Sequence, residues 1–140
     1  MFVYVMLLES LAVIGMLLAG YLIYVERRLF TSKRYKPLCD ISKTVSCSKA
    51  ILSSYGHLIG RLGGPNVDYW ASNAFFGFLY YILVFVLAIA NSSILLPLSL
   101  LAVIASAYLF YVSHYKMKNY CVICMGAYVV NIGIFIVSLP

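Results

Sequence analysis

Charged side chains are scarce in this sequence: they make up 10% of its 140 residues, against about 25% in an ordinary soluble domain. Hydrophobic residues make up 64%, and the mean hydropathy is +0.99. So few polar side chains cannot cover a water-soluble globule of this size, which excludes that class of protein. The composition therefore predicts an integral membrane protein, and the length predicts a single domain over residues 1–140.

Glycine, proline and cysteine are not abundant either, with nine, four and four residues. The first two counts, together with the high hydrophobicity, exclude a collagen-like or intrinsically disordered chain. Four cysteines are too few for a secreted mini-domain stapled by disulfides. Lipid, rather than a large buried core or a disulfide framework, is therefore expected to be the apolar environment of this chain.

Acidic residues are the scarcest of the charged residues, with four against ten Lys and Arg, which gives a net charge of +6. Such an excess can indicate nucleic-acid binding, but here the basic residues are confined to two segments beside hydrophobic runs, and no nucleic-acid motif accompanies them. Eight of the ten lie between residues 26 and 72: Arg27, Arg28, Lys33, Arg34, Lys36, Lys43, Lys49 and Arg61. Lys116 and Lys118 share a second short segment. The pattern predicts loops beside membrane spans and no nucleic-acid partner.

Four apolar runs are long enough, or nearly so, for the roughly 20 residues that a helix needs to cross a bilayer. They cover residues 2–25, 74–90, 94–112 and 121–139, and a long loop over 26–73 separates the first two. Within this loop, apolar residues recur every three or four positions from 51 to 62, which indicates an amphipathic helix lying on the membrane. The predicted fold is an all-α, four-transmembrane-helix bundle with an amphipathic loop over one end.

The four cysteines form two pairs with different spacing, and four spans would bring both pairs to the same face of the membrane. Cys39 and Cys47 are separated by seven residues, whereas Cys121 and Cys124 form a C-x-x-C motif at the start of the fourth run. One mobile pair and one anchored pair are what a relay by thiol–disulfide exchange requires. The start of a helix and the nearby Lys116 and Lys118 are expected to lower the pKa of Cys121.

Two alternatives to a relay remain open at this point. Four thiolates can hold a zinc ion, although the C-x7-C spacing is wide for half of such a site. The same cysteines could also form two inert structural disulfides. Neither alternative requires the polar residues that accompany the cysteines along the chain.

Those polar residues and the cysteines together resemble the vitamin K epoxide reductase family of membrane thiol oxidoreductases. The resemblance covers nearly the whole chain, and the order of its motifs is specific. The motifs are Leu38-Cys39-Asp40, Ser46-Cys47-Ser48, Ser72-Asn73, Phe76-Gly77, Tyr120-Cys121-Val122-Ile123-Cys124, Tyr128 and Asn131.

The resemblance implies a route for electrons and a role for each cysteine. Cys39 would meet a thioredoxin-like dithiol partner, and Cys47 would form a transient bridge to Cys121. Cys124 would lie against a quinone of the menaquinone, ubiquinone or vitamin K type. The implied activity is a quinone-dependent thiol–disulfide oxidoreductase that supports protein disulfide formation, with no metal.

The resemblance also implies a quinone-binding set, consisting of Asn73, Tyr128 and Phe76, and a supporting residue, Ser53. Tyr128 follows Cys124 by four residues, so both lie on one helix face. Each residue of the set has a simpler reading: Asn73 as a helix N-cap, Tyr128 as an interfacial tyrosine and Phe76 as a lipid-facing side chain.

Two loop positions differ from the animal members of the family, which carry Trp where this chain has Tyr55 and Phe where it has Ile51. This difference favours an ordinary quinone over vitamin K epoxide, whose reduction is the alternative function. A zinc-holding membrane scaffold without enzymatic activity is the remote alternative.

The side of the membrane on which the cysteines lie is indicated differently by two arguments. The positive-inside rule places the basic, cysteine-bearing face in the cytoplasm. Most members of the family are read as facing the ER lumen or the periplasm, where disulfides persist. A microbial, hyperthermophilic source would reconcile the two, and a microbial origin also fits the lack of the basic C-terminal tail of animal members. The prediction is a cytoplasmic active site, with an extracytoplasmic or ER-luminal site as the alternative.

Overall fold

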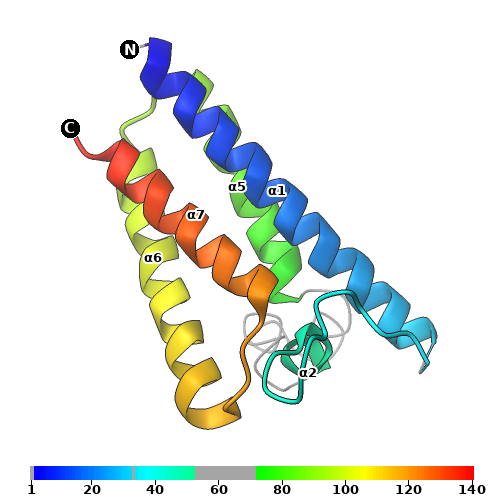
Figure 1. Cartoon of the computed structure of the whole chain (residues 1–140). Coiled ribbons are helices and arrows are strands. Elements are labelled where there is room, and N and C mark those ends of the chain that lie inside the picture. The colour runs from blue at the N-terminus through cyan, green and yellow to red at the C-terminus, as the bar shows by residue number, and fades with distance from the viewer. Residues whose placement is uncertain (1, 33, 53–71) are drawn as a thin grey trace, which may run out of the picture.

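The computed structural model describes residues 2–32, 34–52 and 72–140, and these residues are mostly helical, as predicted. The sequence of elements is α1 (Phe2–Thr31), α2 (Cys47–Leu52), α5 (Asn73–Ile89), α6 (Leu95–Tyr111), the π-helical turn η2 (Val112–Met117) and α7 (Val122–Ser138). The four long helices run side by side, with both termini at one end of the bundle and α2 at the other (Figure 1). The first two residues of the predicted amphipathic helix, Ile51 and Leu52, fall in α2, and the rest of it, with Ser53 and Tyr55, lies outside the described residues.

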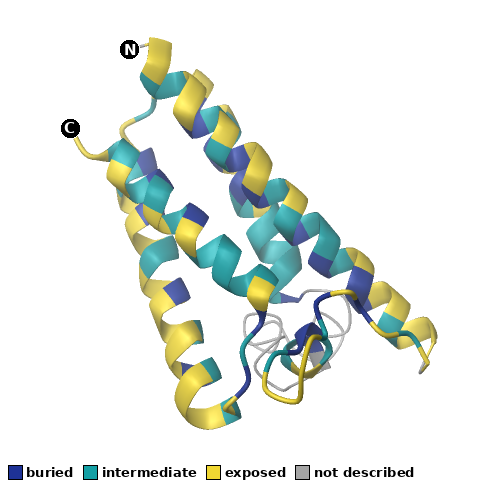
Figure 2. Cartoon of the chain, in the orientation of Figure 1, coloured by how far each residue is buried: buried dark blue, intermediate teal, exposed yellow. Residues whose placement is uncertain are grey.

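Two of the described helical segments are long and apolar enough to cross a membrane. One is α1, with 30 residues and a mean hydropathy of 2.2 over an 18-residue stretch. The other is α6 with η2, which run on without a break over Leu95–Met117, with 23 residues and a mean hydropathy of 2.1 over an 18-residue stretch. Helices α5 and α7 are apolar but have only 17 residues each. All four helices expose large hydrophobic side chains on their outer surfaces, as expected of a bundle surrounded by lipid (Figure 2).

The first helix is longer than its hydrophobic run, and here the sequence-based prediction was wrong. The run ends at Val25, but α1 continues to Thr31, so Arg27 and Arg28 belong to the helix and not to the loop. Glu, Arg and Leu are good helix formers, and no proline follows before Pro37. Helices α5 and α7 begin and end within one residue of the predicted runs, and α6 does so before it continues into η2.

Helix α5 begins with a side-chain cap from Ser72 and not from Asn73. The Ser72 hydroxyl accepts a hydrogen bond from the backbone N–H of Phe75 at 3.2 Å, and Asn73 is the first helical residue. The alternative interpretation of Asn73 as the N-cap is therefore wrong. Asn73 takes part in another interaction.

The helices enclose an apolar core, called here the helix core. Helix α1 packs against α5 and α7, and α7 also packs against α6. The buried members of the helix core are Leu8, Ala12, Ala19, Tyr81, Val84, Ala88, Leu95, Val130 and Ile134. Gly15 allows α1 to approach α5 closely, because a Cβ atom at this position would lie 2.4 Å from the ring of Tyr81. A larger residue at position 15 would force the two helices apart.

One chain of hydrogen bonds joins three helices inside this apolar bundle. Tyr81 on α5 donates to Asn131 Oδ1 on α7 at 2.8 Å, and Asn131 Nδ2 donates to Ser106 Oγ on α6 at 2.8 Å. Ser106 in turn donates to the carbonyl of Ala102 at 2.8 Å. Because α5 and α6 pack little against each other directly, this chain links them through α7.

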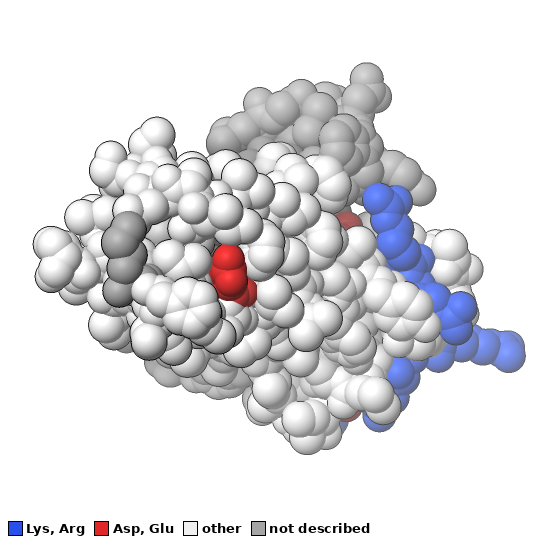
Figure 3. Space-filling model, turned by 90° about the horizontal axis from the view of Figure 1, so that it is seen from above, with Lys and Arg blue, Asp and Glu red and all other residues white. Residues whose placement is uncertain are grey.

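The described basic residues lie toward the end of the bundle that holds α2. They belong to the end of α1, the segment leading into α2, α2 itself and the turn before α7, and they are Arg27, Arg28, Arg34, Lys36, Lys43, Lys49, Lys116 and Lys118. Seen from the opposite end, where the termini lie, the described surface is nearly free of Lys and Arg, which appear only along one edge (Figure 3). The two ends of the bundle therefore differ strongly in charge.

Candidate functional site

The segment before α2 carries a disulfide bond between Cys39 and Cys47. Cys47 is the first residue of α2 and is fully buried, and Cys39 is only 6% exposed. Both belong to a second buried cluster, called here the cysteine core, whose members are Leu22, Val25, Cys39, Cys47, Ile51 and Cys121. The disulfide is thus packed against α1 and against the start of α7.

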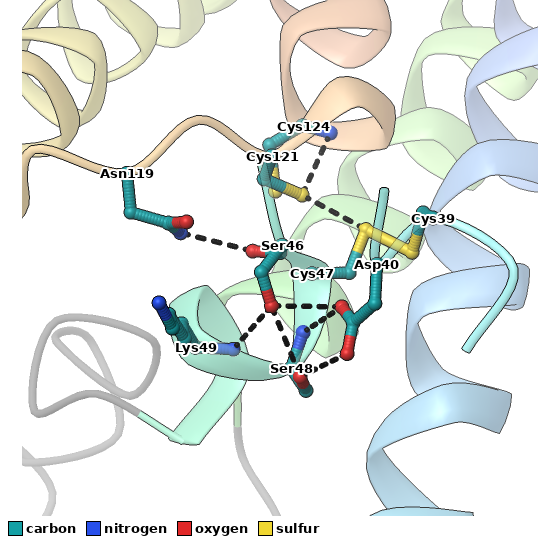
Figure 4. The surroundings of a disulfide bond; sticks show 9 residues. All are labelled: Cys39, Asp40, Ser46, Cys47, Ser48, Lys49, Asn119, Cys121 and Cys124. Carbon is teal, nitrogen blue, oxygen red and sulfur yellow. Dashed lines mark hydrogen bonds between the residues drawn. A yellow bond between two sulfur atoms is a disulfide. The ribbon is translucent and has the colours of Figure 1, made fainter. Parts of the chain in front are cut away.

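A carboxylate next to Cys39 holds the residues on both sides of Cys47 (Figure 4). Asp40 Oδ1 accepts hydrogen bonds from Ser46 Oγ at 2.8 Å and from the backbone N–H of Ser48 at 3.0 Å, and Asp40 Oδ2 accepts one from Ser48 Oγ. Burial raises the pKa of Asp40, but these hydrogen bonds outweigh burial and leave the pKa below its usual value. The ionised carboxylate therefore fixes the loop that carries the disulfide.

The same loop is attached to the residues just before α7. Ser46 N–H donates to the Tyr120 carbonyl at 3.0 Å, and Tyr120 N–H donates to the Thr44 carbonyl at 2.7 Å. The buried side chain of Asn119 adds a hydrogen bond from Nδ2 to the Ser46 carbonyl at 2.9 Å. These three bonds join parts of the chain more than 70 residues apart and bring Cys47 next to Cys121.

The sulfur atoms of Cys47 and Cys121 are 3.5 Å apart. Cys121 and Cys124 are free thiols, so a disulfide and a dithiol lie in contact. A sulfur atom in contact with a disulfide is within reach of thiol–disulfide exchange, which proceeds by attack of a thiolate on one of the bonded sulfurs. The geometry thus allows the two pairs to exchange electrons directly.

Cys121 caps the start of α7 and has a pKa below the usual value of a thiol. The main cause is a hydrogen bond from the Cys124 thiol, and the backbone N–H groups of Cys124 and Ile123 act in the same direction against burial. The bond from Cys124 N–H to Cys121 Sγ measures 3.2 Å. The lowered pKa agrees with expectation, but its causes are these hydrogen bonds and not, as expected, Lys116 and Lys118.

A cavity of about 360 Å³ begins at these cysteines and extends between the helices. Each helix contributes residues spaced three or four apart, which is the spacing of one helix face. The wall of α7 includes Cys121, Cys124, Tyr128 and Asn131, and the wall of α5 includes Asn73, Phe76, Gly77, Tyr80 and Tyr81. The three residues predicted to hold a quinone therefore line one cavity together with Cys124. Its size and its mainly apolar lining are typical of a site for a small organic molecule.

Several polar residues of the cavity were not predicted as site residues from the sequence. Glu26 is only 4% exposed and lines the cavity on α1, and Tyr81, Asn131 and Ser106 line it with their chain of hydrogen bonds. Glu26 follows Ala19 and Leu22 at helical spacing, and all three line the cavity. Glu26 was not predicted as a site residue because the hydrophobic run, and with it the predicted helix, ends at Val25.

The two alternatives to a relay do not match this arrangement of sulfur atoms. A tetrathiolate zinc site needs four thiolates, whereas two of the four sulfurs are joined in a disulfide. A pair of structural disulfides needs a second bond, whereas Cys121 and Cys124 are free thiols. Ser53, the predicted supporting residue, lies outside the described residues.

Apolar helices that hold a disulfide against a free dithiol, at the mouth of a cavity, define a membrane thiol oxidoreductase. Comparison with known proteins identifies the family. The sequence profile of the vitamin K epoxide reductase family matches residues 6–139, and the chain belongs to this family.

Two mammalian relatives are similar over most of their length. Vitamin K epoxide reductase complex subunit 1 of Mus musculus is 30% identical over 136 residues, which cover 92% of this chain and 84% of the relative. Its counterpart in Rattus norvegicus is 29% identical with the same coverage. These similarities carry no support for the expectation of a microbial source, which stays a prediction.

Proposed function

We propose that this protein is a quinone-dependent thiol–disulfide oxidoreductase that passes electrons from a thioredoxin-like dithiol partner to a membrane quinone and so supports protein disulfide formation. The observation that carries the proposal is the 3.5 Å contact between Cys47 Sγ and Cys121 Sγ, at the mouth of an apolar cavity. This contact joins the buried disulfide of the segment before α2 to the dithiol at the start of α7.

The internal transfer consists of two exchange steps. In a chain with a reduced loop pair, the Cys47 thiolate attacks the Cys121 sulfur of a Cys121–Cys124 disulfide, and Cys124 leaves as a thiolate. The Cys39 thiolate then attacks Cys47, which forms the Cys39–Cys47 disulfide and releases Cys121. Two electrons have moved inward, and the products are an oxidised loop pair and a reduced inner pair. This is the combination of redox states in the structure.

The second half of the reaction oxidises Cys121 and Cys124 to a disulfide and reduces the quinone by two electrons and two protons. Cys124 lines the cavity on the same helix face as Tyr128. Asn73 and Tyr128 are the proposed hydrogen-bond donors to the quinone oxygens, where each donor stabilises developing negative charge. Phe76 is the proposed packing partner of the ring.

The test is the reduction of a short-chain quinone by purified protein with dithiothreitol as the electron source. Cys124→Ala is expected to abolish turnover and to accumulate a Cys47–Cys121 bridge, which peptide mapping by mass spectrometry would detect. Val122→Ala, on an exposed side chain in the same turn of α7, is the control. Quinone reduction that survives Cys124→Ala would contradict the proposal.

A second candidate, the reduction of vitamin K epoxide, is favoured by the 30% identity to the mouse vitamin K epoxide reductase subunit. The same cysteines would then pass the partner's electrons to the epoxide, and the main product of the reaction would be the regenerated hydroquinone. Turnover with the epoxide, measured beside turnover with an unmodified quinone, separates the two. Activity with the quinone alone would support the first candidate.

We further propose that residues 1–140 form one domain with four membrane spans and that the cysteine-bearing end faces the cytoplasm. The proposal is supported by the four apolar helices and by the basic residues gathered at one end. Single cysteines introduced for labelling, Lys43→Cys at one end and Ser93→Cys at the other, can be tested with a membrane-impermeant maleimide in intact cells. With the cysteine-bearing end in the cytoplasm, Ser93→Cys should be labelled and Lys43→Cys should not. Labelling of Lys43→Cys would place the native cysteine pairs outside the cytoplasm.

A further inference from the structure

The disulfide is recessed, but the residues beside it are unusually exposed. Cys39 is 6% exposed, whereas Leu38 is 91% and Ile41 is 70% exposed. Leu38 is the most exposed large hydrophobic side chain among the described residues, and it lies outside the long helices. Single exposed apolar residues are common, but two of them beside a buried reactive bond mark a contact site for another molecule.

The segment that carries these two residues has more positive than negative charge. Lys36, Lys43 and Lys49 are exposed on the same segment, and the Lys49 ammonium donates a hydrogen bond to the Lys43 carbonyl, which keeps it near Lys43. The ionised Asp40 offsets one of these three charges, so the segment from Lys36 to Lys49 keeps a positive excess. Asp40 is engaged by Ser46 and Ser48, and Glu26 is buried.

We propose that Leu38 and Ile41, together with Lys36, Lys43 and Lys49 of the same segment, form the docking surface for the dithiol partner, and that this partner is a protein with apolar residues beside its reacting thiol and an acidic rim. The positive charge of this surface is complementary to an acidic partner, because it speeds the approach of an acidic protein and selects against a basic one. The inference rests on the proposed function and adds the chemical character of the partner.

The recess explains why the reaction needs docking. A partner thiolate must reach Cys39 Sγ, form a mixed disulfide with it and expel Cys47 as a thiolate. The second thiol of the partner then attacks the mixed disulfide, which leaves the partner oxidised and Cys39 as a thiol. Two electrons have entered the loop pair, with two protons from the partner. Contacts with Leu38 and Ile41 would hold the partner while its thiolate reaches the recessed bond.

The test uses three synthetic peptides with one C-x-x-C core flanked by acidic, neutral or basic residues, and dithiothreitol as a small reductant that needs no docking. The readout is kcat/KM for quinone reduction at low and at high salt. We expect the acidic peptide to exceed the basic one by about tenfold at low salt, and the difference to fall to less than about twofold at 0.5 M salt because of screening.

Two double variants test the two parts of the surface. Lys36→Glu/Lys43→Glu should reverse the preference between acidic and basic peptides, whereas Lys118→Glu, in the turn before α7, should leave it in place. Leu38→Ser/Ile41→Ser should lower the ratio of peptide turnover to dithiothreitol turnover by about tenfold. Leu139→Ser, an exposed leucine near the C-terminus, should leave that ratio unchanged.

The outcomes distinguish this inference from the function on which it rests. Equal turnover of all three peptides, with normal turnover of dithiothreitol, would overturn the docking surface and leave the proposed function standing. Equal losses with peptides and with dithiothreitol in Leu38→Ser/Ile41→Ser would also overturn it, in favour of a membrane contact by these residues. Absence of quinone reduction with every reductant would overturn the proposed function itself.

Discussion

The helix core and the cysteine core lie in the same bundle but depend on different contacts. All nine buried members of the helix core lie on α1, α5, α6 and α7, and none is a cysteine. The cysteine core has six buried members, of which Cys39, Cys47 and Cys121 are three. Packing in the helix core is therefore independent of redox state, whereas the packing of the cysteine core includes the bonds that the proposed reaction breaks and forms. The residues that stabilise the fold and those that react are largely separate along the helix axis.

The largest expected effect comes from removing a sulfur of the cysteine core. Cys47→Ala removes both the disulfide and the contact with Cys121, and quinone-dependent dithiol oxidation should fall by at least about 10³-fold, as for the loss of a catalytic nucleophile. Val25→Ala is the matched control, because Val25 is fully buried in the same cluster and carries no sulfur. It should destabilise the fold by about 1–2 kcal/mol and retain turnover. Equal turnover of the two variants would break the distinction between the cores.

The next largest effect concerns the helix core. Gly15→Ala would place a Cβ atom 2.4 Å from the Tyr81 ring, and we expect a loss of about 2–3 kcal/mol in the free energy of unfolding. Gly20→Ala is the control on the same helix, because its Cβ atom would lie 3.9 Å from the Phe78 ring, an ordinary contact. Thermal unfolding in detergent should show a lower midpoint for the first variant alone. A similar midpoint for both would mean that α1 and α5 are not closely packed at Gly15.

A smaller effect is expected at Asp40, which fixes the loop of the cysteine core. The pKa of Asp40 is lower in the folded protein than in the unfolded chain, where it is about 3.9. Its ionised form therefore stabilises the fold at pH values above the unfolded pKa, and this contribution is lost as the pH falls through the folded pKa. Asp40→Asn should therefore lower the free energy of unfolding at pH 7 by about 1 kcal/mol, which a lower midpoint of thermal unfolding would show. The variant and the unaltered protein should converge in acid. A difference that persists below the folded pKa would mean that charge is not the cause.

The smallest effect concerns the pH at which the Cys121 thiol becomes reactive. Because its pKa is lowered, labelling by methyl methanethiosulfonate should rise with pH at a midpoint below that of an ordinary thiol, about 8.5. Cys124→Ala, made in a chain whose Cys47 is replaced by Ala so that no bridge to Cys121 can form, removes the main hydrogen bond, and the midpoint should move up. Lys116→Gln and Lys118→Gln should leave it in place, since hydrogen bonds and not these lysines lower the pKa. A shift in the lysine variants would restore the explanation expected from the sequence.

The hydrophobic runs predicted most of the fold, because the apolar runs and the helices have nearly the same limits at α5 and α7 and nearly the same start at α6. The end of α1 was not predictable from hydropathy, since its last turns are polar and continue by helix propensity. The two cysteine pairs followed from their spacing, whereas the role of each cysteine and the quinone-binding set came from the resemblance to the family. The Asp40 network was missed, although Asp40 follows Cys39 and serines flank Cys47, because hydrogen bonds across a loop depend on its three-dimensional course. Glu26 was missed for the same reason as the end of α1.

The unequal lengths of the helices have a consequence for the surrounding membrane. At about 1.5 Å per residue, α1 rises about 45 Å and the 17-residue α5 and α7 rise about 25 Å each. The hydrocarbon core of a typical bilayer is about 30 Å thick, so a bilayer crossed by all four helices must become thinner beside α5 and α7. Such hydrophobic mismatch favours thin membranes for this protein. It would also bring the lipid headgroups, and the water beyond them, closer to the two cysteine pairs.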